Sequence, residues 1–206
     1  ALTLGLPPTI TAMTGIDAMV HAIEAYTTKL KKNPISDALA LRGLSLLAMN
    51  IRKVLADGSD LDARESMLLG AMFAGQAFAN APVAAVHALA YPLGGHYHIP
   101  HGLSNSLMLP AVLAFNAPAV GDQYAELAAV LPDAPATAAG LIEWFNTLII
   151  DSGLPVSLAE AHVPEADLPM LAADAMLQQR LLVNNPLPVD EQTALNLYRQ
   201  AWVGCS

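Results

Sequence analysis

An aspartate and a histidine stand at a spacing that suits a shared metal ion. Asp17 and His21 are four residues apart in a segment whose apolar residues recur at helical spacing. Both side chains would therefore leave the same face of a helix, one turn apart. A carboxylate and an imidazole so placed can bind one ion, but they can equally form a simple hydrogen-bonded pair, and the spacing also occurs by chance. The pair alone indicates half of a candidate site.

The other histidines gather in a segment rich in glycine and proline. Because prolines and glycines interrupt residues 91–101, we predict a loop there. His87 would end one helix and His101 would begin the next, and glycines would let the two converge. This pattern is compatible with metal binding. It is also compatible with ordinary histidines that are hydrogen-bonded or exposed. The ordinary interpretation is favoured for His96, and the two are evenly balanced for His98.

Glu24 lies three residues beyond His21 on the same predicted helix face. It could be a metal ligand, an acceptor for a histidine ring N–H, or an exposed carboxylate. We favour the acceptor role, because histidines that bind metals usually donate their second N–H to such a group.

Helical periodicity runs through nearly the whole chain, whereas alternating strand patterns are almost absent, so we predict an all-α fold. The small residues within 62–80 predict that a neighbouring helix packs closely against this segment. We expect Ser36 to cap the second helix, Asp62 to begin the third with a capping box, and Pro110 to kink a later one. The expected helices are 15–27, 36–54, 62–80, a short one ending near 90, 102–114, 123–131, 137–150, 165–179 and 190–202, with a turn at 151–155.

Composition narrows the classes of partner. Net charge is −9, and no Lys or Arg lies between Arg64 and Arg180, which argues against nucleic acid. Residues 102–120 come closest to a membrane span but contain polar residues, so we predict a buried helix and no membrane. The single cysteine, Cys205, excludes an internal disulfide and favours a cytoplasmic protein. Apolar residues make up 54% and charged residues 13%, against about 25% charged in average proteins, so we expect apolar surface that another domain or subunit covers.

Three segments carry a resemblance to a known family. TGIDAMVHAIEAY (14–26) with NPISDALAL (33–41) resembles the first signature of iron-containing alcohol dehydrogenases. HALAYPLGGHYHIPHG (87–102) resembles their second signature, and NNPLPVDEQTALNLYRQAW (184–202) is similar to the way such chains end. The resemblance covers nearly the whole chain, and two long signatures in the right order are highly specific.

The resemblance implies a fold and an activity. The family has an N-terminal α/β dinucleotide-binding domain and a C-terminal all-helical domain of the dehydroquinate-synthase-like type that carries the metal. Residues 1–206 match only the helical, metal-binding domain, which explains why no Gly-rich phosphate loop occurs in this sequence. By position, Asp17, His21, His87 and His101 match the family's metal ligands. The resemblance implies a cytoplasmic enzyme that forms homo-oligomers, here expected as a dimer. Such an enzyme transfers hydride between a small alcohol or aldehyde and NAD or NADP, and it uses Fe²⁺ with Zn²⁺ as a substitute.

One position departs from the family pattern. Many members have a histidine four residues after the third ligand, where it is thought to relay a proton, and this chain has Tyr91. A phenol has a pKa near ~10, against ~6.5 for imidazole, so Tyr91 is the poorer proton carrier at neutral pH. His98 or water is the alternative carrier, and we take Tyr91 and His98 as the candidate catalytic residues.

Other functions stay open from sequence. A maleylacetate-reductase-like or glycerol-dehydrogenase-like enzyme is disfavoured, because all four ligand positions are filled. A stand-alone helical protein that binds metal or a partner subunit without redox chemistry is the main alternative, and a metallohydrolase with Glu24 as general base is a weaker one. For the dehydrogenase, we expect little or no activity from this chain without the nucleotide-binding domain.

Overall fold

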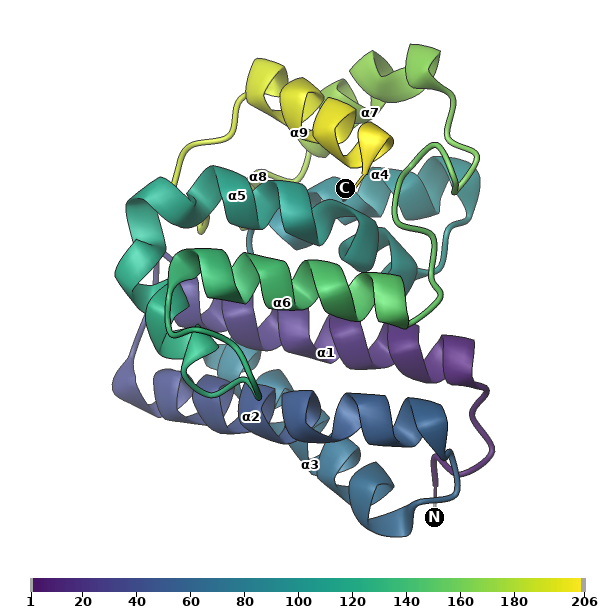
Figure 1. Ribbon diagram of the computed structural model, residues 1–206. Helices are drawn as coiled ribbons and strands as arrows, with labels where there is room; N and C mark the ends of the chain where they lie inside the picture. The colour runs from purple at the N-terminus through teal and green to yellow at the C-terminus, as the bar shows by residue number, and fades with distance from the viewer. Residues whose placement is uncertain (1, 205–206) are drawn as a thin grey trace.

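The computed structural model describes residues 2–204, and every regular element in this range is a helix (Figure 1). The predicted all-α fold is confirmed. The α-helices are α1 (Pro8–Thr27), α2 (Pro34–Ala56), α3 (Leu61–Asn80), α4 (Ala85–Tyr97), α5 (His101–Ala128), α6 (Ala138–Asp151), α7 (Leu168–Ala175), α8 (Gln179–Leu182) and α9 (Glu191–Val203). Cys205 lies outside the described residues.

Helix α1 lies in the interior of the bundle, in contact with α2, α3 and α5 (Figure 1). Its apolar residues are buried around most of its circumference, as expected of a core helix. The helix begins at Pro8, earlier than the predicted residue 15, because a proline fits the first turn, where its missing N–H has no partner to lose. The helix that carries Asp17 and His21 is therefore held on several sides.

Helices α2 and α3 pack closely through glycines. A Cβ atom added to Gly43 would lie 2.9 Å from the carbonyl oxygen of Gly70, and one added to Gly70 would lie 3.0 Å from that of Gly43. The close neighbour predicted from the small residues of α3 is thus α2. The predicted caps were wrong by a few residues. Asn33 caps α2 by accepting from the N–H of Ser36, and Asp60 caps α3 by accepting from the N–H of Ala63.

The predicted loop at 91–101 was largely wrong, because α4 continues through Pro92 to Tyr97. Pro92 removes one hydrogen bond of the helix, but its ring and Leu93 are buried, and α4 packs against α5 and α7. Tertiary packing therefore outweighs the local cost. The helix ends at His98, whose left-handed backbone (φ 55°) lets its N–H reach the carbonyl of Gly94.

Helix α5 is longer than predicted and bends elsewhere. It runs to Ala128, so the separate helix expected at 123–131 is its final part. The break lies at Val120 (φ −130°, ψ 28°), after Pro118 and not at Pro110. Within residues 2–204, α5 is the one unbroken helix that is long and apolar enough to cross a membrane by length and composition. Of its most apolar stretch, 56% is buried inside the bundle. Burial of this kind is typical of the core helix that the sequence predicts.

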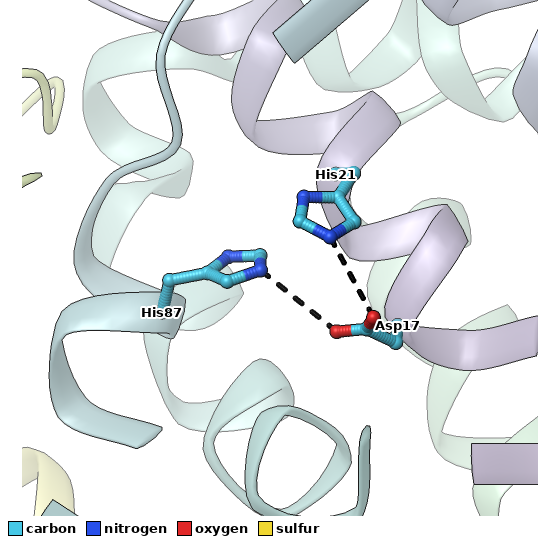
Figure 2. Close-up of side chains that lie close together, drawn as sticks. All are labelled: Asp17, His21 and His87. Carbon is cyan, nitrogen blue, oxygen red and sulfur yellow. Dashed lines mark ion pairs between the residues drawn. The ribbon is translucent and has the colours of Figure 1, made fainter. Parts of the chain in front are cut away.

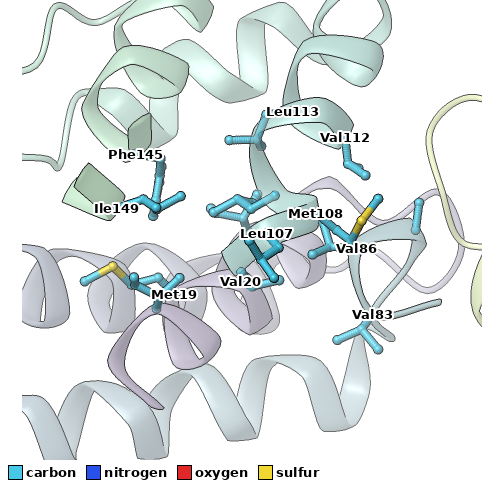
Figure 3. Packing of buried hydrophobic residues seen from close by; sticks show 14 of the residues in the cluster. Met19, Val20, Val83, Val86, Leu107, Met108, Val112, Leu113, Phe145 and Ile149 are labelled. Carbon is cyan, nitrogen blue, oxygen red and sulfur yellow. The ribbon is translucent and has the colours of Figure 1, made fainter. Parts of the chain in front are cut away.

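The C-terminal part agrees with the sequence in most elements. Helices α6 and α9 lie within two residues of their predicted positions, and Gly153 (φ 70°) makes the turn that follows α6. The predicted helix at 165–179 instead divides into a short 3-10 helix (Glu165–Asp167) and α7, with α8 after it. The main core joins side chains of α1, α5 and α6, among them Met19, Leu107 and Phe145 (Figure 3).

Candidate metal centre

Side chains from three helices converge on the carboxylate of Asp17. Its Oδ2 lies 3.5 Å from Nε2 of His21, one turn further along α1. Its Oδ1 lies 3.8 Å from Nε2 of His87 at the start of α4, and 3.5 Å from Nε2 of His101 at the start of α5. Figure 2 shows the rings of His21 and His87 directed toward the carboxylate. The structure therefore brings Asp17, His21 and His87 within 4.8 Å of one another, and His101 contacts the same carboxylate without joining that group.

A glycine places His101 beside Asp17. A Cβ atom added to Gly102 would lie 2.4 Å from the carbonyl oxygen of Met13, so only glycine allows α5 to approach α1 this closely. The contact is next to His101 in the chain and one turn before Asp17. The sequence thus sets the distance between the two predicted ligands by leaving out one side chain.

Glu24 fixes the start of α4 and contacts His87. Its Oε1 accepts the N–H of Val86 (2.7 Å), and its Oε2 accepts that of Ala84 (2.9 Å). The same Oε2 lies 2.7 Å from Nδ1 of His87. The contact with a histidine ring nitrogen that we favoured from sequence is present, although its partner is His87 and not the neighbouring His21.

The residues fit a bound cation. Nε2 of His87 is buried, has no hydrogen-bond partner within residues 2–204, and faces Asp17. A buried nitrogen of this kind is costly unless a donor or an ion occupies the space in front of it. Two ligands about 2.1 Å from one ion at a tetrahedral angle lie about 3.4 Å apart, close to the separations of 3.5–3.8 Å around Asp17. Imidazole and carboxylate together suit iron, zinc, cobalt or nickel.

Asn105 and Phe78 also belong to the site, and sequence reasoning missed both. Nδ2 of Asn105 donates to Oδ1 of Asp17 (2.5 Å) and lies 3.2 Å from Nε2 of His101. The ring of Phe78 stacks on that of His21, with centroids 4.3 Å apart. The four-residue step from His101 to Asn105 on one helix was the available signal for Asn105. No comparable signal marked Phe78.

The electrostatics favour the forms that bind metals. Burial raises the pKa of Asp17, but the hydrogen bond and charge of His21, with Asn105 and His101, outweigh it and lower the pKa below 3.8. Burial lowers the pKa of His101, and the charges of His87 and His21 lower it further. The charge of Asp17 raises it, but not enough to offset these effects. Asp17 is therefore a carboxylate and His101 a neutral imidazole at neutral pH.

The remaining predicted residues lie at different distances from this centre. Tyr91 is 37% exposed and its ring lies 5.8 Å from that of His101, at the edge of the cluster. His98 is exposed at the end of α4, and no contact in the described part of the chain joins it to the four ligands. His96 pairs with Asp174 of α7 (2.9 Å), in agreement with the ordinary role favoured for it.

Comparisons with known proteins show the family to which the chain belongs. The family model "Fe-containing alcohol dehydrogenase family, C-terminal" matches residues 11–202. The chain is 40% identical to long-chain-alcohol dehydrogenase 1 of Geobacillus thermodenitrificans, over 98% of this chain and 53% of that protein. It superposes on the crystal structure of a 1,3-propanediol oxidoreductase with a TM-score of 0.91 and 38% identity, covering 97% of this chain and 53% of that one.

A further solved structure adds a bound nucleotide. Sulfoacetaldehyde reductase from Bifidobacterium kashiwanohense in complex with NAD⁺ superposes with a TM-score of 0.86 and 26% identity, over 96% of this chain and 51% of that one. The chain thus spans about half the length of the relatives it matches. With a family match over most of its residues, the chain belongs to the iron-containing alcohol dehydrogenase family and carries the C-terminal part of it.

Proposed function

We propose that this chain holds the catalytic metal of an NAD(P)-linked alcohol dehydrogenase, which oxidises small alcohols or reduces aldehydes by hydride transfer. The observation that carries the proposal is the buried Nε2 of His87, which has no hydrogen-bond partner in the described part of the chain. It faces the carboxylate of Asp17 together with two further imidazoles. Relatives named for long-chain alcohols and for 1,3-propanediol support an alcohol as the substrate, and the second of them supports a small one. A relative solved with NAD⁺ supports the nucleotide.

Asp17, His21, His87 and His101 would hold Fe²⁺, with Zn²⁺ as a substitute, since both metals accept nitrogen and oxygen ligands. A divalent ion there supplies Lewis-acid polarisation, which lowers the pKa of an alcohol hydroxyl. Asp17 contributes the one negative charge, and the neutral imidazoles leave a net positive site that attracts the oxygen of the substrate. Glu24, Asn105 and Phe78 contact the ligand side chains and keep their orientation.

Tyr91 is the nearer of the two proposed proton carriers. Its ring is partly exposed and lies 5.8 Å from that of His101. His98 would need a water chain to reach the substrate from its exposed position at the end of α4. The pH dependence of the rate tests the two residues. A profile that shifts in Tyr91→Phe and is unchanged in His98→Ala would assign the role to Tyr91.

We further propose that residues 1–206 form the helical metal-binding domain and that a separate α/β domain binds the nucleotide. Exposed apolar side chains on α3 give the helical part a surface for another domain or for a second copy in a homodimer. Leu61 is 55% exposed, and Leu68 and Met72 are each 48% exposed. Exposed apolar residues gathered on one helix are typical of contact surfaces.

Metal content tests the site directly. After anaerobic loading with Fe(II), we expect about one ion per chain by elemental analysis, because the cluster offers four ligands. His87→Ala and His101→Ala should lose the ion. His96→Ala is the matched control, since His96 pairs with Asp174 away from the cluster, and it should keep the ion. An iron-free wild-type chain, or an unchanged content in His87→Ala, would contradict the proposal.

A second experiment tests the redox activity. The iron-loaded chain with an alcohol and NAD⁺ should form little or no NADH, and the nucleotide-binding half of the 1,3-propanediol oxidoreductase should restore the reaction. Appreciable turnover by this chain alone would contradict the division of roles between two domains. Tight iron binding with no turnover under any complementation would favour the stand-alone metal-binding protein.

A further inference from the structure

A buried carboxylate on α1 makes two kinds of contact at the start of α4. Glu24 is 4% exposed and accepts the backbone N–H groups of Ala84 and Val86. No side chain of α4 itself caps this helix, because its N-cap residue is Ala84. Glu24 therefore replaces the missing cap from another helix, where the positive end of the helix dipole also favours an anion.

The same carboxylate faces His87, three residues after that N-cap. Oε2 of Glu24 lies 2.7 Å from Nδ1 of His87, and the histidine is 1% exposed. An ionised carboxylate can only accept hydrogen bonds, so Nδ1 must be the donor. The proton then sits on Nδ1, and Nε2 keeps a lone pair that faces Asp17 at 3.8 Å.

His21 provides a contrast within the same site. Its Nδ1 is buried without a hydrogen-bond partner in the described part of the chain, and its ring is held by stacking on Phe78 and His87. Its position is thus set by packing, and no partner in the described residues holds a proton on its Nδ1. Among the contacts of residues 2–204, His87 is the ring facing Asp17 whose second nitrogen contacts a buried carboxylate.

We infer that Glu24 is a positioning residue that holds His87 in the Nδ1–H tautomer and so keeps Nε2 free to bind the ion. The inference rests on the proposed metal function. The other tautomer would put a proton on Nε2, and that nitrogen could not then bind a metal. Because Glu24 also caps α4, the position of the ring and the position of its proton depend on one side chain.

The tautomer can be measured in the metal-free 206-residue chain by long-range ¹H–¹⁵N correlation of the histidine rings. We expect His87 to be protonated at Nδ1 in the wild type. Glu24→Met keeps an unbranched side chain but removes both acceptors, and it should shift His87 toward the Nε2–H form. Glu24→Gln keeps one carbonyl oxygen, which can accept from Nδ1, but its NH2 group then faces the N–H donor of Val86. It should therefore weaken the cap of α4 while it retains the tautomer.

Co²⁺ binding gives the second measurement. Loss of such a contact typically weakens metal binding about 10–100-fold, so we expect that change for Glu24→Met. Asn184→Ala is the matched control, because Asn184 donates to the carbonyl of Val83 in the same segment but does not contact His87. It should leave the tautomer and the Co²⁺ dissociation constant unchanged.

Two results would overturn the inference: a wild-type His87 protonated at Nε2, which needs no variant to observe, or an unchanged tautomer in Glu24→Met. If Glu24→Met does not fold, the wild-type spectrum still decides. The spectra are recorded without metal, so they test the tautomer independently of the proposed function. A failure of the proposed function would instead appear as a wild type that has the Nδ1–H tautomer but does not bind Co²⁺.

Discussion

Gly102→Ala tests whether the close approach of α5 to α1 builds the metal centre. The added Cβ would meet the carbonyl oxygen of Met13 at 2.4 Å, whereas ordinary contact begins at 3.4 Å, so the two backbones must separate by 1.0 Å. Backbone atoms on both sides cannot rotate away as a side chain would. Overpacking of this kind costs about 1–3 kcal/mol, and the higher helix propensity of alanine offsets up to about 1 kcal/mol.

The effect on metal binding should be larger than the effect on stability. His101 precedes Gly102, and metal–ligand distances tolerate only about 0.2 Å. A shift of 1.0 Å in the start of α5 would therefore remove His101 from the ligand set. We expect the Co²⁺ dissociation constant to rise by more than about tenfold. A tenfold rise is about the smallest effect that is typical when a group that contacts a ligand side chain, without binding the metal itself, is lost.

The assay combines urea denaturation, followed by circular dichroism, with Co²⁺ titration. Gly75→Ala is the matched control, because a Cβ at Gly75 in the interior of α3 meets nothing within 4 Å. It should raise the free energy of unfolding by about 0.5–1 kcal/mol and leave metal binding unchanged. If Gly102→Ala were as stable as Gly75→Ala and bound Co²⁺ as tightly as the wild type, the α1–α5 contact would not set the position of His101.

Three further predictions concern single contacts. The pKa of Asp17 is lower in the folded chain than its usual 3.8, so its contribution to stability is present above that pH and is lost as the pH falls through the folded value. Urea denaturation at decreasing pH should show this loss. Asp17→Asn should reduce the dependence of the free energy of unfolding on pH. Asn105→Ala removes a charge-assisted hydrogen bond to Asp17 and should lower the free energy of unfolding by about 2 kcal/mol; a change near zero would show that water replaces the amide. Tyr198→Phe removes the buried hydrogen bond to the carbonyl of Leu89 and should cost about 1 kcal/mol by the same measurement, while a stabilised variant would contradict that contact.

Local spacing was enough to predict part of the centre. Asp17 and His21 share one turn of a continuous helix, so the sequence fixes their relation almost alone. His87 and His101 do converge, but by packing of α4 against α5 and not through the expected long loop. The predicted convergence is present, but the predicted local structure was wrong, because packing against α5 and α7 outweighs the effect that Pro92 has on an isolated helix.

Other parts of the centre depend on contacts that no local pattern encodes. Asn105 and Asp17 are 88 residues apart, and their contact exists only once α5 lies against α1. Phe78 reaches His21 from α3 for the same reason. The fold class was predictable because helical periodicity recurs in every segment, whereas these pairings follow from tertiary packing.

The proline inside α4 bears on the order of folding. Pro92, with Gly94 and Gly95 close behind it, leaves this helix little intrinsic stability, so it should form only when α5 and α7 are present to pack against it. His87 would then join the cluster in a late step, after α1 has already placed two ligands on one turn. During refolding, the rate at which a Co²⁺ spectrum develops should therefore report the docking of α4, and replacement of Pro92 by alanine should make that step faster.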